Sequence, residues 1–325
     1  MYKESIFLKH FPKFNYNKED KMNKNILVVG SLNMDISITM KKMPIVGETI
    51  LGNSMQYSNG GKGANQACAI GKLGGNVEML GCIGSDDFGK NQEANLSKFN
   101  VNTKNLKISE TTPTGTAVIY VDENGKNSIV VVAGANNFCN IEYLRSQEES
   151  FKNSDYLLLQ LEIPMEAVKY SVEKGKELGK TVILNPAPAP DFICDEILKN
   201  IDYFTPNESE LQRLANLEKM ETLEDVEKGA RVFLEKGVKN VMVTLGENGV
   251  LLVNKDTVQH FPANKVKAVD TTAAGDCFNG AFVLGLSEGK SIADSIIFAN
   301  KASSIAVTRK GAQNSIPMRE EVESL

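Results

Sequence analysis

Short apolar runs alternate with longer amphipathic stretches along the second half of the chain. Residues 156–160 (YLLLQ) and 181–185 (TVILN) are short and rich in leucine or β-branched side chains, as buried strands are. The stretch from Met165 to Leu178 between them has the length and pattern of a helix. Alternation of this kind predicts βαβ units, whose strands lie parallel within one sheet.

The same alternation extends toward both ends of the chain. Strands are predicted from Asn25 to Gly30, Tyr203 to Thr205 and Asn240 to Thr244, and helices from Ile193 to Lys199, Leu223 to Glu235, Ala274 to Leu286 and Ser291 to Thr308. The chain is expected to end in a loop after the last of these helices. The predicted fold class is α/β with a mostly parallel central sheet.

Two segments depart from this pattern. Residues 36–57 and the run 114–134, in which Asn124-Gly125 suits a tight turn, are typical of hairpins rather than of βαβ units. We expect a separate, small antiparallel sheet with strands from about residues 36–57 and 115–133. A sheet that projects from an α/β body can cover a substrate pocket as a lid or present a dimerisation surface, and we expect both roles.

Composition narrows the class of protein. The chain has 325 residues, of which 42% are hydrophobic and 24% charged, as in an ordinary globular protein. A net charge of −5 argues against a nucleic-acid partner, which requires a concentrated basic surface. No apolar run approaches the roughly 20 residues of a membrane span, and the N-terminus lacks the apolar core of a secretory signal. We therefore expect neither a membrane nor a nucleic acid as partner.

Cysteine and histidine content limits the chemistry. The five cysteines are scattered and never spaced as C-x-x-C, which argues against a disulfide framework or a zinc site and fits the reducing cytoplasm. Only two histidines are present, so any general base should be a carboxylate. Residues 1–22 lack clear periodicity and are predicted to be a disordered, dispensable extension; a short amphipathic anchor is the alternative.

The strongest chemical signal is the segment 269–276 (VDTTAAGD), an extended run that turns through small residues into an apolar helix. Unpaired backbone donors at such a helix start, here Ala273, Ala274 and Gly275, can bind an anion and suit a phosphoryl group in transfer. Asp276 in the first turn can accept a proton from an attacking hydroxyl. The alternative is that Asp276 only stabilises the helix dipole.

A second glycine loop, residues 59–66 (NGGKGANQ), enters a helix predicted from Ala64 to Leu73. It matches neither the Walker A pattern nor a complete G-x-G-x-x-G, which weakens both classical nucleotide-binding interpretations. Its glycines permit close backbone approach, and Lys62 and Asn65 offer donors to hydroxyls, which together suit a polyol site. A plain helix entry with flexible glycines is the alternative.

Asn33 and Asp35 follow the first predicted strand, where open α/β sheets bind ligands. Because they are two residues apart, an extended segment can place both side chains on one face, where they can hydrogen-bond sugar hydroxyls. Turn formation is the competing explanation.

Taken together, eight segments resemble the ribokinase family, also called the PfkB carbohydrate kinases. They are SLNMD, GGKGANQA, LQLEIP, LNPAPAP, TPNESE, TLGENG, VDTTAAGDCFNGA and AVTRKGAQNS, in the family's order from about residue 25 to the C-terminus. The resemblance implies a three-layer αβα fold with a small β-sheet lid through which a homodimer forms. It also implies ATP-dependent phosphorylation of D-ribose at the O-5 hydroxyl to ribose 5-phosphate, with Mg²⁺ and K⁺ as further cofactors.

The resemblance assigns ligand contacts to single residues. Sugar contacts fall on Asn33, Asp35, Gly61, Lys62, Gly63, Ala64, Asn65, Glu162 and Asp276. ATP contacts fall on Asn207, Thr244, Leu245, Gly246, Glu247, Asn248, Gly249, Gly275 and Asn300. Glu162 could instead be a solvated loop acid, and the loop 244–249 could be a plain hairpin turn. Asn300 is assigned by position alone, and a partly exposed helix asparagine is common.

Metal ligands are assigned in the same way. Asn207 and Glu210 serve Mg²⁺, which prefers hard oxygen ligands and keeps several waters; a helix cap is the alternative, and both can hold together. The ligands of K⁺ fall on Asp270, Thr272, Ala306, Arg309, Gly311 and Ser315, most of them through backbone carbonyls. The side chain of Arg309 is cationic, so only its main-chain oxygen can take part. Bound K⁺ would fix the geometry of residues 273–276.

Other functions remain open from the sequence. A kinase of the same family could act on deoxyribose, fructose, a nucleoside or a phosphosugar. A non-catalytic sugar sensor is a second possibility, against which the presence of Asp276, Gly275, Asn207 and Glu210 argues. A dinucleotide-dependent oxidoreductase is suggested by the run ILVVG, but no G-x-G-x-x-G follows that strand.

Overall fold

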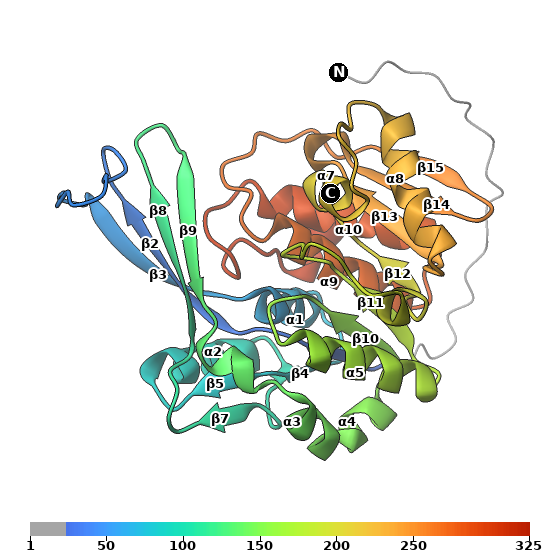
Figure 1. Ribbon diagram of the computed structural model, residues 1–325, viewed down its shortest axis with the longest axis horizontal. Helices are drawn as coiled ribbons and strands as arrows, with labels where there is room; N and C mark the ends of the chain where they lie inside the picture. The colour runs from blue at the N-terminus through green and yellow to red at the C-terminus, as the bar shows by residue number, and fades with distance from the viewer. Residues whose placement is uncertain (1–23) are drawn as a thin grey trace.

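The computed structural model describes residues 24–325 (Figure 1). The predicted N-terminal extension, residues 1–22, lies outside the described residues. A nine-stranded sheet forms the centre of the described part, and a four-stranded sheet projects from one side of it (Figure 1). The predicted α/β class and the separate small sheet are therefore confirmed.

The large sheet is parallel over most of its width. Its strand order is β15-β14-β13-β12-β11-β10-β1-β4-β6, and only the pairs β13–β14 and β14–β15 are antiparallel. The strands are β1 (Ile26–Val29), β4 (Val77–Leu80), β6 (Val101–Asn102), β10 (Tyr156–Leu159), β11 (Thr181–Leu184), β12 (Tyr203–Phe204), β13 (Asn240–Thr244), β14 (Val250–Asn254) and β15 (Val258–Phe261). The strands predicted near residues 25, 203 and 240 correspond to β1, β12 and β13.

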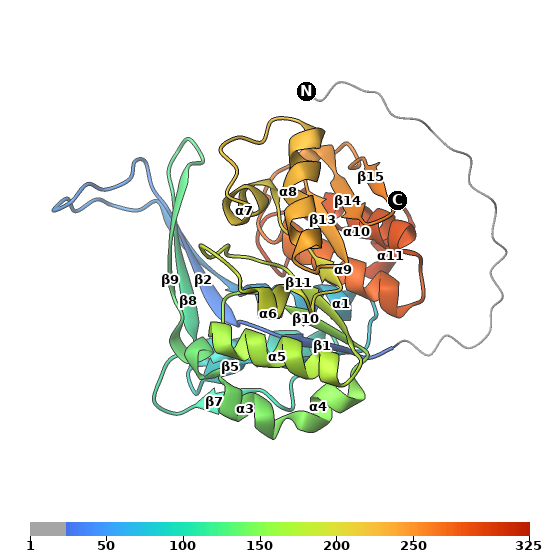
Figure 2. The same ribbon diagram turned by 45° about the vertical axis from the view of Figure 1, so that its right-hand side comes forward.

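Helices cover both faces of this sheet because its strands are apolar on both sides. In β1, Ile26 and Val28 belong to one hydrophobic core and Leu27 and Val29 to the other, and all four are buried. Burial of each such side chain stabilises the fold by roughly 1.5–3 kcal/mol. Figure 2 shows α5 and α8 on one side of the sheet and α9 and α10 on the other, which gives the three-layer architecture.

Each helix contributes to only one of the two hydrophobic cores, so the helices form two layers. The first core receives α1 (Lys62–Lys72), α2 (Asp87–Lys98), α9 (Ala274–Ser287), α10 (Ile292–Ala306) and α11 (Arg319–Glu323). The second core receives α3 (Ile141–Ser146), α4 (Glu148–Asn153), α5 (Met165–Glu177), α6 (Asp195–Leu198), α7 (Glu208–Leu214) and α8 (Leu223–Glu235). Two 3-10 turns, η1 (Gly134–Phe138) and η2 (Gly246–Asn248), and a short parallel pair, β5 (Cys82–Gly84) with β7 (Lys107–Ser109), complete the elements.

Capping residues explain where α8 and α10 start. Two predictions were wrong, one about the start of α1 and one about the end of the chain. Thr222 and Asp225 form a capping box on α8, and Ser291 caps α10, at the predicted positions. Helix α1 begins at Lys62 rather than Ala64, because Gly61 at its N-cap takes a left-handed φ of 87° and turns the chain two residues earlier. The chain does not end in a loop, since α11 follows it and Arg319 pairs with the buried Glu288.

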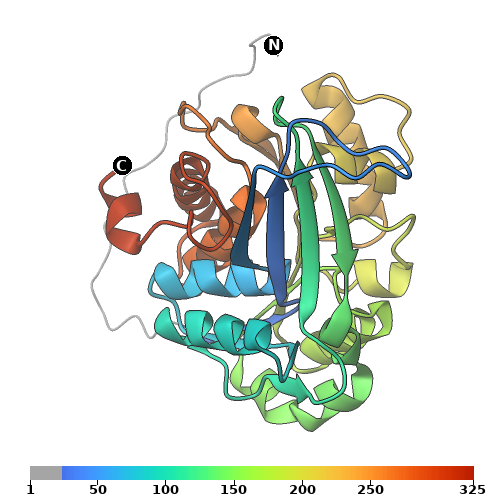
Figure 3. The ribbon, with the colours of Figure 1, turned by 90° about the vertical axis from the view of Figure 1, so that its left-hand side faces the viewer.

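The projecting sheet has the order β3-β2-β8-β9 and is shown face-on in Figure 3. Its strands are β2 (Asn33–Thr39), β3 (Ser54–Gly60), β8 (Gly115–Val121) and β9 (Asn127–Val132). The predicted turn is present: Gly125 has a φ of 77°, and the N–H of Lys126 and of Asn124 donate to the Asp122 carboxylate. We refer to this four-stranded sheet as the lid sheet.

The lid sheet is mixed rather than antiparallel, which corrects the prediction. Strands β2 and β8 pair in parallel, while β2–β3 and β8–β9 are antiparallel. The two predicted hairpins are thus both real, but they join side by side in parallel because each enters the sheet from the same end of the body. Strand β9 exposes Ile129, Val130, Val131 and Val132, each more than half accessible to solvent. A continuous exposed apolar strand of this kind is typical of an interaction surface.

Close packing of α1 against β1 depends on Gly63. A Cβ atom at this position would lie 2.7 Å from the carbonyl carbon of Gly30 and from the nitrogen of Ser31, which are both backbone atoms. We predict that Gly63→Ala lowers the free energy of unfolding by roughly 1–3 kcal/mol, because neither backbone segment can move without distorting the sheet. Urea denaturation measures this change. Gly52→Ala, whose Cβ would meet only ordinary contacts from 3.4 Å, is the matched control and should stay near wild type.

Candidate active site

Helices α1 and α9 start at the same edge of the large sheet, beside the carboxyl ends of its parallel strands. Hydrogen bonds from the first turn of α1 reach Asp276 in α9 and Asn185 after β11. The main-chain N–H of Lys62, also in α1, reaches Glu162 after β10. This edge is where open α/β sheets bind ligands. The structure thus brings together four predicted motifs that are up to 211 residues apart.

Asp276 is buried and held from two sides. Its Oδ2 accepts a hydrogen bond of 2.9 Å from Asn65 Nδ2, and its Oδ1 accepts one of 3.0 Å from Gln66 Nε2. The carboxylate lies in the first turn of α9 and is only 7% exposed. A carboxylate that only offset the helix dipole would not need two side-chain donors from another helix. Its orientation is therefore set by tertiary contacts.

The first turn of α9 offers free donors beside this carboxylate. Within the described residues, no protein acceptor receives the main-chain N–H of Gly275 or Asp276. Ala273 precedes them with a left-handed φ of 58°, a conformation that costs a non-glycine residue about 1 kcal/mol or more. A Cβ at Gly275 would meet nothing within 4 Å. Neither backbone strain nor packing in the protein thus requires a glycine at 275, and the open space beside it can receive a ligand.

The glycine loop before α1 combines two roles. Gly61 has a left-handed φ and allows the turn, while Gly63 packs on Gly30 and Ser31, as described above. Ala64 is fully buried and donates its N–H to the Ser31 carbonyl. Gly63 and Ala64, predicted as sugar contacts, are thus engaged with the protein itself. Gly61, Lys62 and Asn65 are the other predicted sugar contacts of this loop, and the role of all five toward a sugar stays a prediction.

Glu162 is held by the protein, unlike a solvated loop acid. Its Oε2 accepts hydrogen bonds from Ser31 Oγ at 2.6 Å and from the main-chain N–H of Lys62 at 3.1 Å. These bonds join the loop after β10 to the loop after β1 and to the start of α1. Glu162 Oε1 accepts no hydrogen bond from the described residues, so it can accept one from a ligand.

Four carboxylates surround the ammonium group of Lys62. Burial lowers the pKa of Lys62, but the attraction of the carboxylates outweighs this and the net shift is upward. The carboxylates are those of Asp276, Glu162, Glu210 and Asp35. Lys62 therefore stays positively charged and offsets part of the negative charge of the site.

Two of these carboxylates have altered proton affinities. Burial, followed by the charges of Glu162 and Asp276, raises the pKa of Asp35 to about 7. Burial also raises the pKa of Glu210, although the N–H of Asn207 and the charge of Lys62 oppose the shift. Perturbed carboxyl groups in one cleft are typical of functional sites.

Asn33 and Asp35 share one face of β2, at the base of the lid sheet, as predicted. Asn33 is 3% and Asp35 9% exposed. The Oδ1 of Asn33 accepts a hydrogen bond of 2.7 Å from Asn136 Nδ2, while its own amide group donates to no described residue. Asn33 thus presents a hydrogen-bond donor to the site and Asp35 an acceptor.

Several buried amides of the site escaped the sequence prediction. Gln66 receives a hydrogen bond of 2.6 Å from Gln160 Nε2 and donates to Asn185 Oδ1 at 3.1 Å as well as to Asp276. Asn65 Oδ1 is buried without a partner among the described residues. Gln66, Gln160 and Asn185 lie inside the quoted motifs GGKGANQA, LQLEIP and LNPAPAP, so the motifs were the available signal. An unsatisfied buried acceptor costs about 1–3 kcal/mol, which a ligand hydroxyl at Asn65 would relieve.

The predicted ATP residues lie along the ends of β12 and β13. Asn207 forms a single parallel bridge with Thr244, which brings the two segments side by side. The loop 244–249 joins the antiparallel strands β13 and β14, so the hairpin alternative is also correct. The side chain of Leu245 is buried, and only its main chain can contact a ligand. Asn300 comes from α10, where its amide donates to the Pro262 carbonyl at 3.4 Å. Pro262 lies beside Gly249, since a Cβ atom at Gly249 would be 2.8 Å from the Pro262 carbonyl carbon.

Asn207 and Glu210 form a reciprocal cap on α7, as the alternative reading predicted. Asn207 Oδ1 accepts from the Glu210 N–H, and Glu210 Oε2 accepts from the Asn207 N–H. Glu210 Oε1 accepts no hydrogen bond from the described residues. Glu210 also lies near enough to Lys62 and Asp276 for their charges to affect its own pKa. The cap therefore fixes the start of α7 and also orients the carboxylate of Glu210 toward the site.

The predicted K⁺ residues come from two loops that Asp270 joins. Its carboxylate accepts from the N–H of Thr272 and from the N–H of Gly311, each at 2.9 Å, and these bonds lower the pKa of Asp270 despite burial. The carbonyls of Asp270, Thr272, Arg309 and Gly311 accept no hydrogen bond within the described residues. The Arg309 guanidinium pairs with Glu321, and the Ser315 hydroxyl donates to the Ala312 carbonyl. Ala306 contributes a carbonyl that accepts from the Arg309 N–H.

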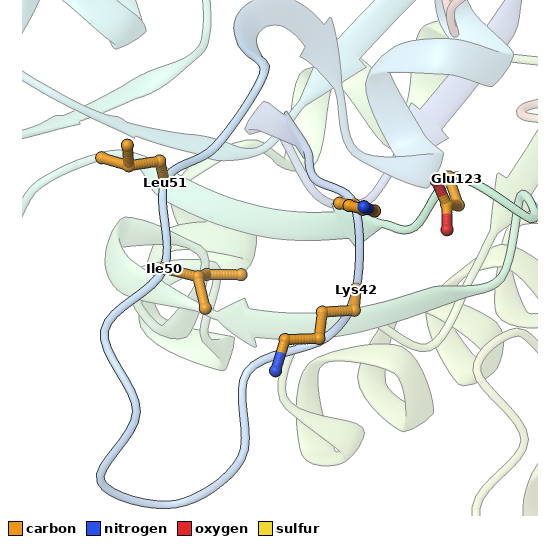
Figure 4. Close-up of a pocket in the computed structure, with 5 residues that line it drawn as sticks. Lys42, Ile50, Leu51 and Glu123 are labelled. Carbon is orange, nitrogen blue, oxygen red and sulfur yellow. The ribbon is translucent and has the colours of Figure 1, made fainter.

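A separate hollow lies on the lid sheet (Figure 4). It is lined by Lys41, Lys42, Ile50, Leu51 and Glu123, which come from the loop after β2 and from the turn between β8 and β9. None of the predicted site residues lines it. We therefore place the candidate active site at the edge of the large sheet.

Comparison with known proteins agrees with this geometry. The pattern of the pfkB family of carbohydrate kinases matches residues 23–319. The chain belongs to this family. A ribokinase from Haemophilus influenzae is 42% identical over 300 residues, which cover 92% of this chain and 97% of that protein. A deoxyribokinase from Salmonella typhi is 37% identical over 297 residues, or 91% of this chain and 97% of that protein.

A solved structure resembles this carbohydrate kinase along nearly its whole length. The ribokinase of Arabidopsis thaliana, complexed with ribose and ATP, superposes with a TM-score of 0.88 at 35% identity, over 93% of this chain and 98% of that one. Family membership sets aside the oxidoreductase alternative. In the described part of the kinase, no helix is both long enough and apolar enough to cross a membrane.

The raised pKa of Asp35 predicts a specific dependence of stability on pH. The folded pKa of about 7 lies above the unfolded value of 3.8, so the stabilising contribution is complete below about pH 4 and is lost as the pH rises through about 7. Asp35→Asn removes this loss. Between about pH 5 and 7, the free energy of unfolding should therefore fall less in the variant than in the wild type, by roughly 1 kcal/mol per pH unit.

Urea denaturation at several pH values measures this difference. Asp256→Asn, at an exposed turn after β14, is the control and should follow the wild-type curve. Parallel curves for the wild type and Asp35→Asn would show that Asp35 has an ordinary pKa.

Proposed function

We propose that this carbohydrate kinase transfers the γ-phosphoryl group of ATP to the O-5 hydroxyl of D-ribose. The observation that carries the proposal is the arrangement around Asp276: an oriented, buried carboxylate beside free N–H donors and the open space at Gly275. The similarity to ribokinases along nearly the whole chain supports ribose as the acceptor.

In the proposed reaction, Asp276 accepts the proton of the sugar hydroxyl as its oxygen attacks the γ-phosphorus. The new P–O bond forms at O-5, the bond to the ADP oxygen breaks, and ADP leaves with its electron pair. The N–H groups of Gly275 and Asp276 stabilise negative charge on the transferring group. Ala273 and Ala274 form the turn that presents them, and the N–H of Ala274, predicted to be unpaired, donates instead to the Thr271 carbonyl at 3.2 Å. Because Asn65 and Gln66 hold both carboxylate oxygens, Asp276 needs no reorientation before it accepts the proton.

The sugar would lie between the base of the lid sheet and the start of α1. Asn33 offers a donor, Asp35 and Glu162 Oε1 offer acceptors, and the unpaired Asn65 Oδ1 accepts from a hydroxyl. Gly61 and Lys62 lie at the start of α1 between these groups. Such a mixture of donors and acceptors suits a polyol, whose hydroxyls both donate and accept.

ATP would lie along the ends of β12 and β13, with its γ-phosphate toward Gly275. Asn207 and the loop 244–249 would contact the nucleotide, and Asn300 would lie at its outer end. Glu210 would hold Mg²⁺ through water, since one free carboxylate oxygen and hard ligands suit this ion. When bound to the ATP phosphates, Mg²⁺ neutralises charge that develops during transfer.

The two loops joined by Asp270 fit a monovalent cation. Four carbonyls without protein donors, at Asp270, Thr272, Arg309 and Gly311, provide the neutral oxygen ligands that K⁺ accepts. We propose that the Ala306 carbonyl and Ser315 complete this K⁺ site. Its effect would be to hold residues 273–276 in the strained turn before α9.

The lid sheet is proposed to cover the sugar and to form a homodimer. Strand β9 supports this, because its exposed valines and isoleucine would be buried by a second lid sheet. The cytoplasm is the proposed location, in line with five cysteines that are all free. Deoxyribose is the second candidate substrate, on the similarity to a deoxyribokinase.

Asp276→Asn tests the proposed base. The amide keeps the size of the side chain but cannot accept a proton, so we predict a fall in kcat of about 10²–10⁴-fold with little change in sugar affinity. ADP release and calorimetric sugar binding measure the two effects. Asp87→Asn, at an exposed first-turn acid of α2, is the control and should keep wild-type turnover. Near-normal turnover of Asp276→Asn would exclude this residue as the base.

The substrate proposal is tested by ADP release from Mg·ATP with ribose, deoxyribose, fructose, a nucleoside and fructose 6-phosphate, each with and without K⁺. We predict the highest kcat/KM with ribose and stimulation by K⁺. Preference for another acceptor would retain the mechanism and replace the substrate. Absence of turnover with every acceptor would favour a sugar sensor.

A further inference from the structure

One helix holds the bases of three lid strands. Gln92 in α2 is fully buried, and its Nε2 donates to the main-chain carbonyls of Asn33 and of Gly60, the latter at 2.9 Å. Asn33 is the first residue of β2, and Gly60 is the last of β3. Asp86, the N-cap of α2, accepts from the N–H and the hydroxyl of Thr114, directly before β8. Helix α2 therefore sets where the lid sheet leaves the body (Figure 1).

Gln92 also connects to the loop near the C-terminus. Its Oε1 lies 3.4 Å from Gln313 Nε2, a contact between residues 221 positions apart. Asn95, one turn further along α2, donates to Gln313 Oε1 at 2.5 Å. Gln313 is 1% exposed, and its main-chain carbonyl accepts from Lys72 Nζ at 2.7 Å. The amide of Gln313 is thus fixed on both sides, with no solvent between it and α2.

These contacts use the whole hydrogen-bonding capacity of the Gln92 donor. A primary amide has two N–H groups, and both are spent on the carbonyls that begin β2 and end β3. An apolar side chain of similar size could fill the same space, but it would remove both of these hydrogen bonds to the strand carbonyls. The two hydrogen bonds of Gln92 therefore do more than fill space in the core, because they determine the position of β2, the strand that carries Asn33 and Asp35.

We propose that Gln92 is a positioning residue for the sugar site and that Gln313 couples the position of Gln92 to that of the loop 310–316. We call the contact between Gln92 and Gln313 the relay. The proposal rests on the proposed sugar contacts at Asn33 and Asp35. Gln92 acts on β2 and makes no contact with Asp276, which is held by α1. Replacing Gln92 should therefore change sugar affinity while the transfer step stays nearly intact.

The variants Gln92→Met, Gln313→Met and their combination test the relay. Asn91→Met, at an exposed position of the same helix, is the matched control. Hydrogen–deuterium exchange without ligand reports the strand ends, and steady-state kinetics with saturating ATP report KM and kcat for the sugar.

We expect Gln92→Met to speed exchange in peptides that cover residues 33–39 and 54–60 and to raise KM about tenfold, the effect of roughly one lost hydrogen bond, with kcat within about twofold. Gln313→Met, which contacts neither strand, should speed exchange in the same peptides and raise KM by less. The double variant should match Gln92→Met alone, since both changes break one relay. The control should match the wild type.

Independent effects that multiply in the double variant would overturn the relay, and unchanged exchange at 33–39 and 54–60 in Gln92→Met would overturn the positioning role. An equal fall of kcat in all variants would assign the pair a purely structural role. Should Gln92→Met not fold by circular dichroism, Gln313→Met decides alone by its exchange at the strand ends. The exchange result does not depend on which sugar the panel selects, so it can stand if the ribose assignment fails.

Discussion

The contact between the first turns of α1 and α9 is the interaction on which the rest of the site depends. Asn65 and Gln66 donate to the two oxygens of Asp276, so the helix that carries the proposed base and the helix that follows the glycine loop are fixed against each other. The close approach is possible because Gly63 and Gly280 leave no Cβ between α1 and its neighbours. With the two helix starts joined, the free N–H groups of α9 and the positive dipole ends of both helices face one region.

This convergence explains how the fold tolerates a concentration of acids. Four carboxylates lie around Lys62, a density that would repel strongly in a buried place. The ammonium group, the two helix starts and the hydrogen bonds to Glu162 and Asp276 offset that repulsion. Burial first, and the charges of neighbouring carboxylates second, raise the pKa values of Asp35 and Glu210. The cost of the acids is thus concentrated on two residues of the candidate site.

The lid sheet depends on the body for its position. Its strands have little core of their own, and β9 is exposed along its whole length. Buried polar contacts at the strand bases, from Gln92, Asn136 and Asp86, replace a hydrophobic core there. Hydrogen bonds are directional, and a base held in this way defines the direction of the strands more closely than apolar packing would.

The sequence by itself determined the fold class, the boundaries of several helices and strands, and the motifs of the site. Apolar periodicity predicted β13 and α8 to the residue, and small residues before Asp276 predicted a helix start, because these are properties of neighbouring residues. Only the tertiary structure decided the parallel pairing of β2 with β8, the packing role of Gly63, and the amides of Gln66, Asn136 and Gln92 that hold the site residues. Each of these depends on which distant segment lies alongside, and a buried glutamine has no local pattern that reveals its partner.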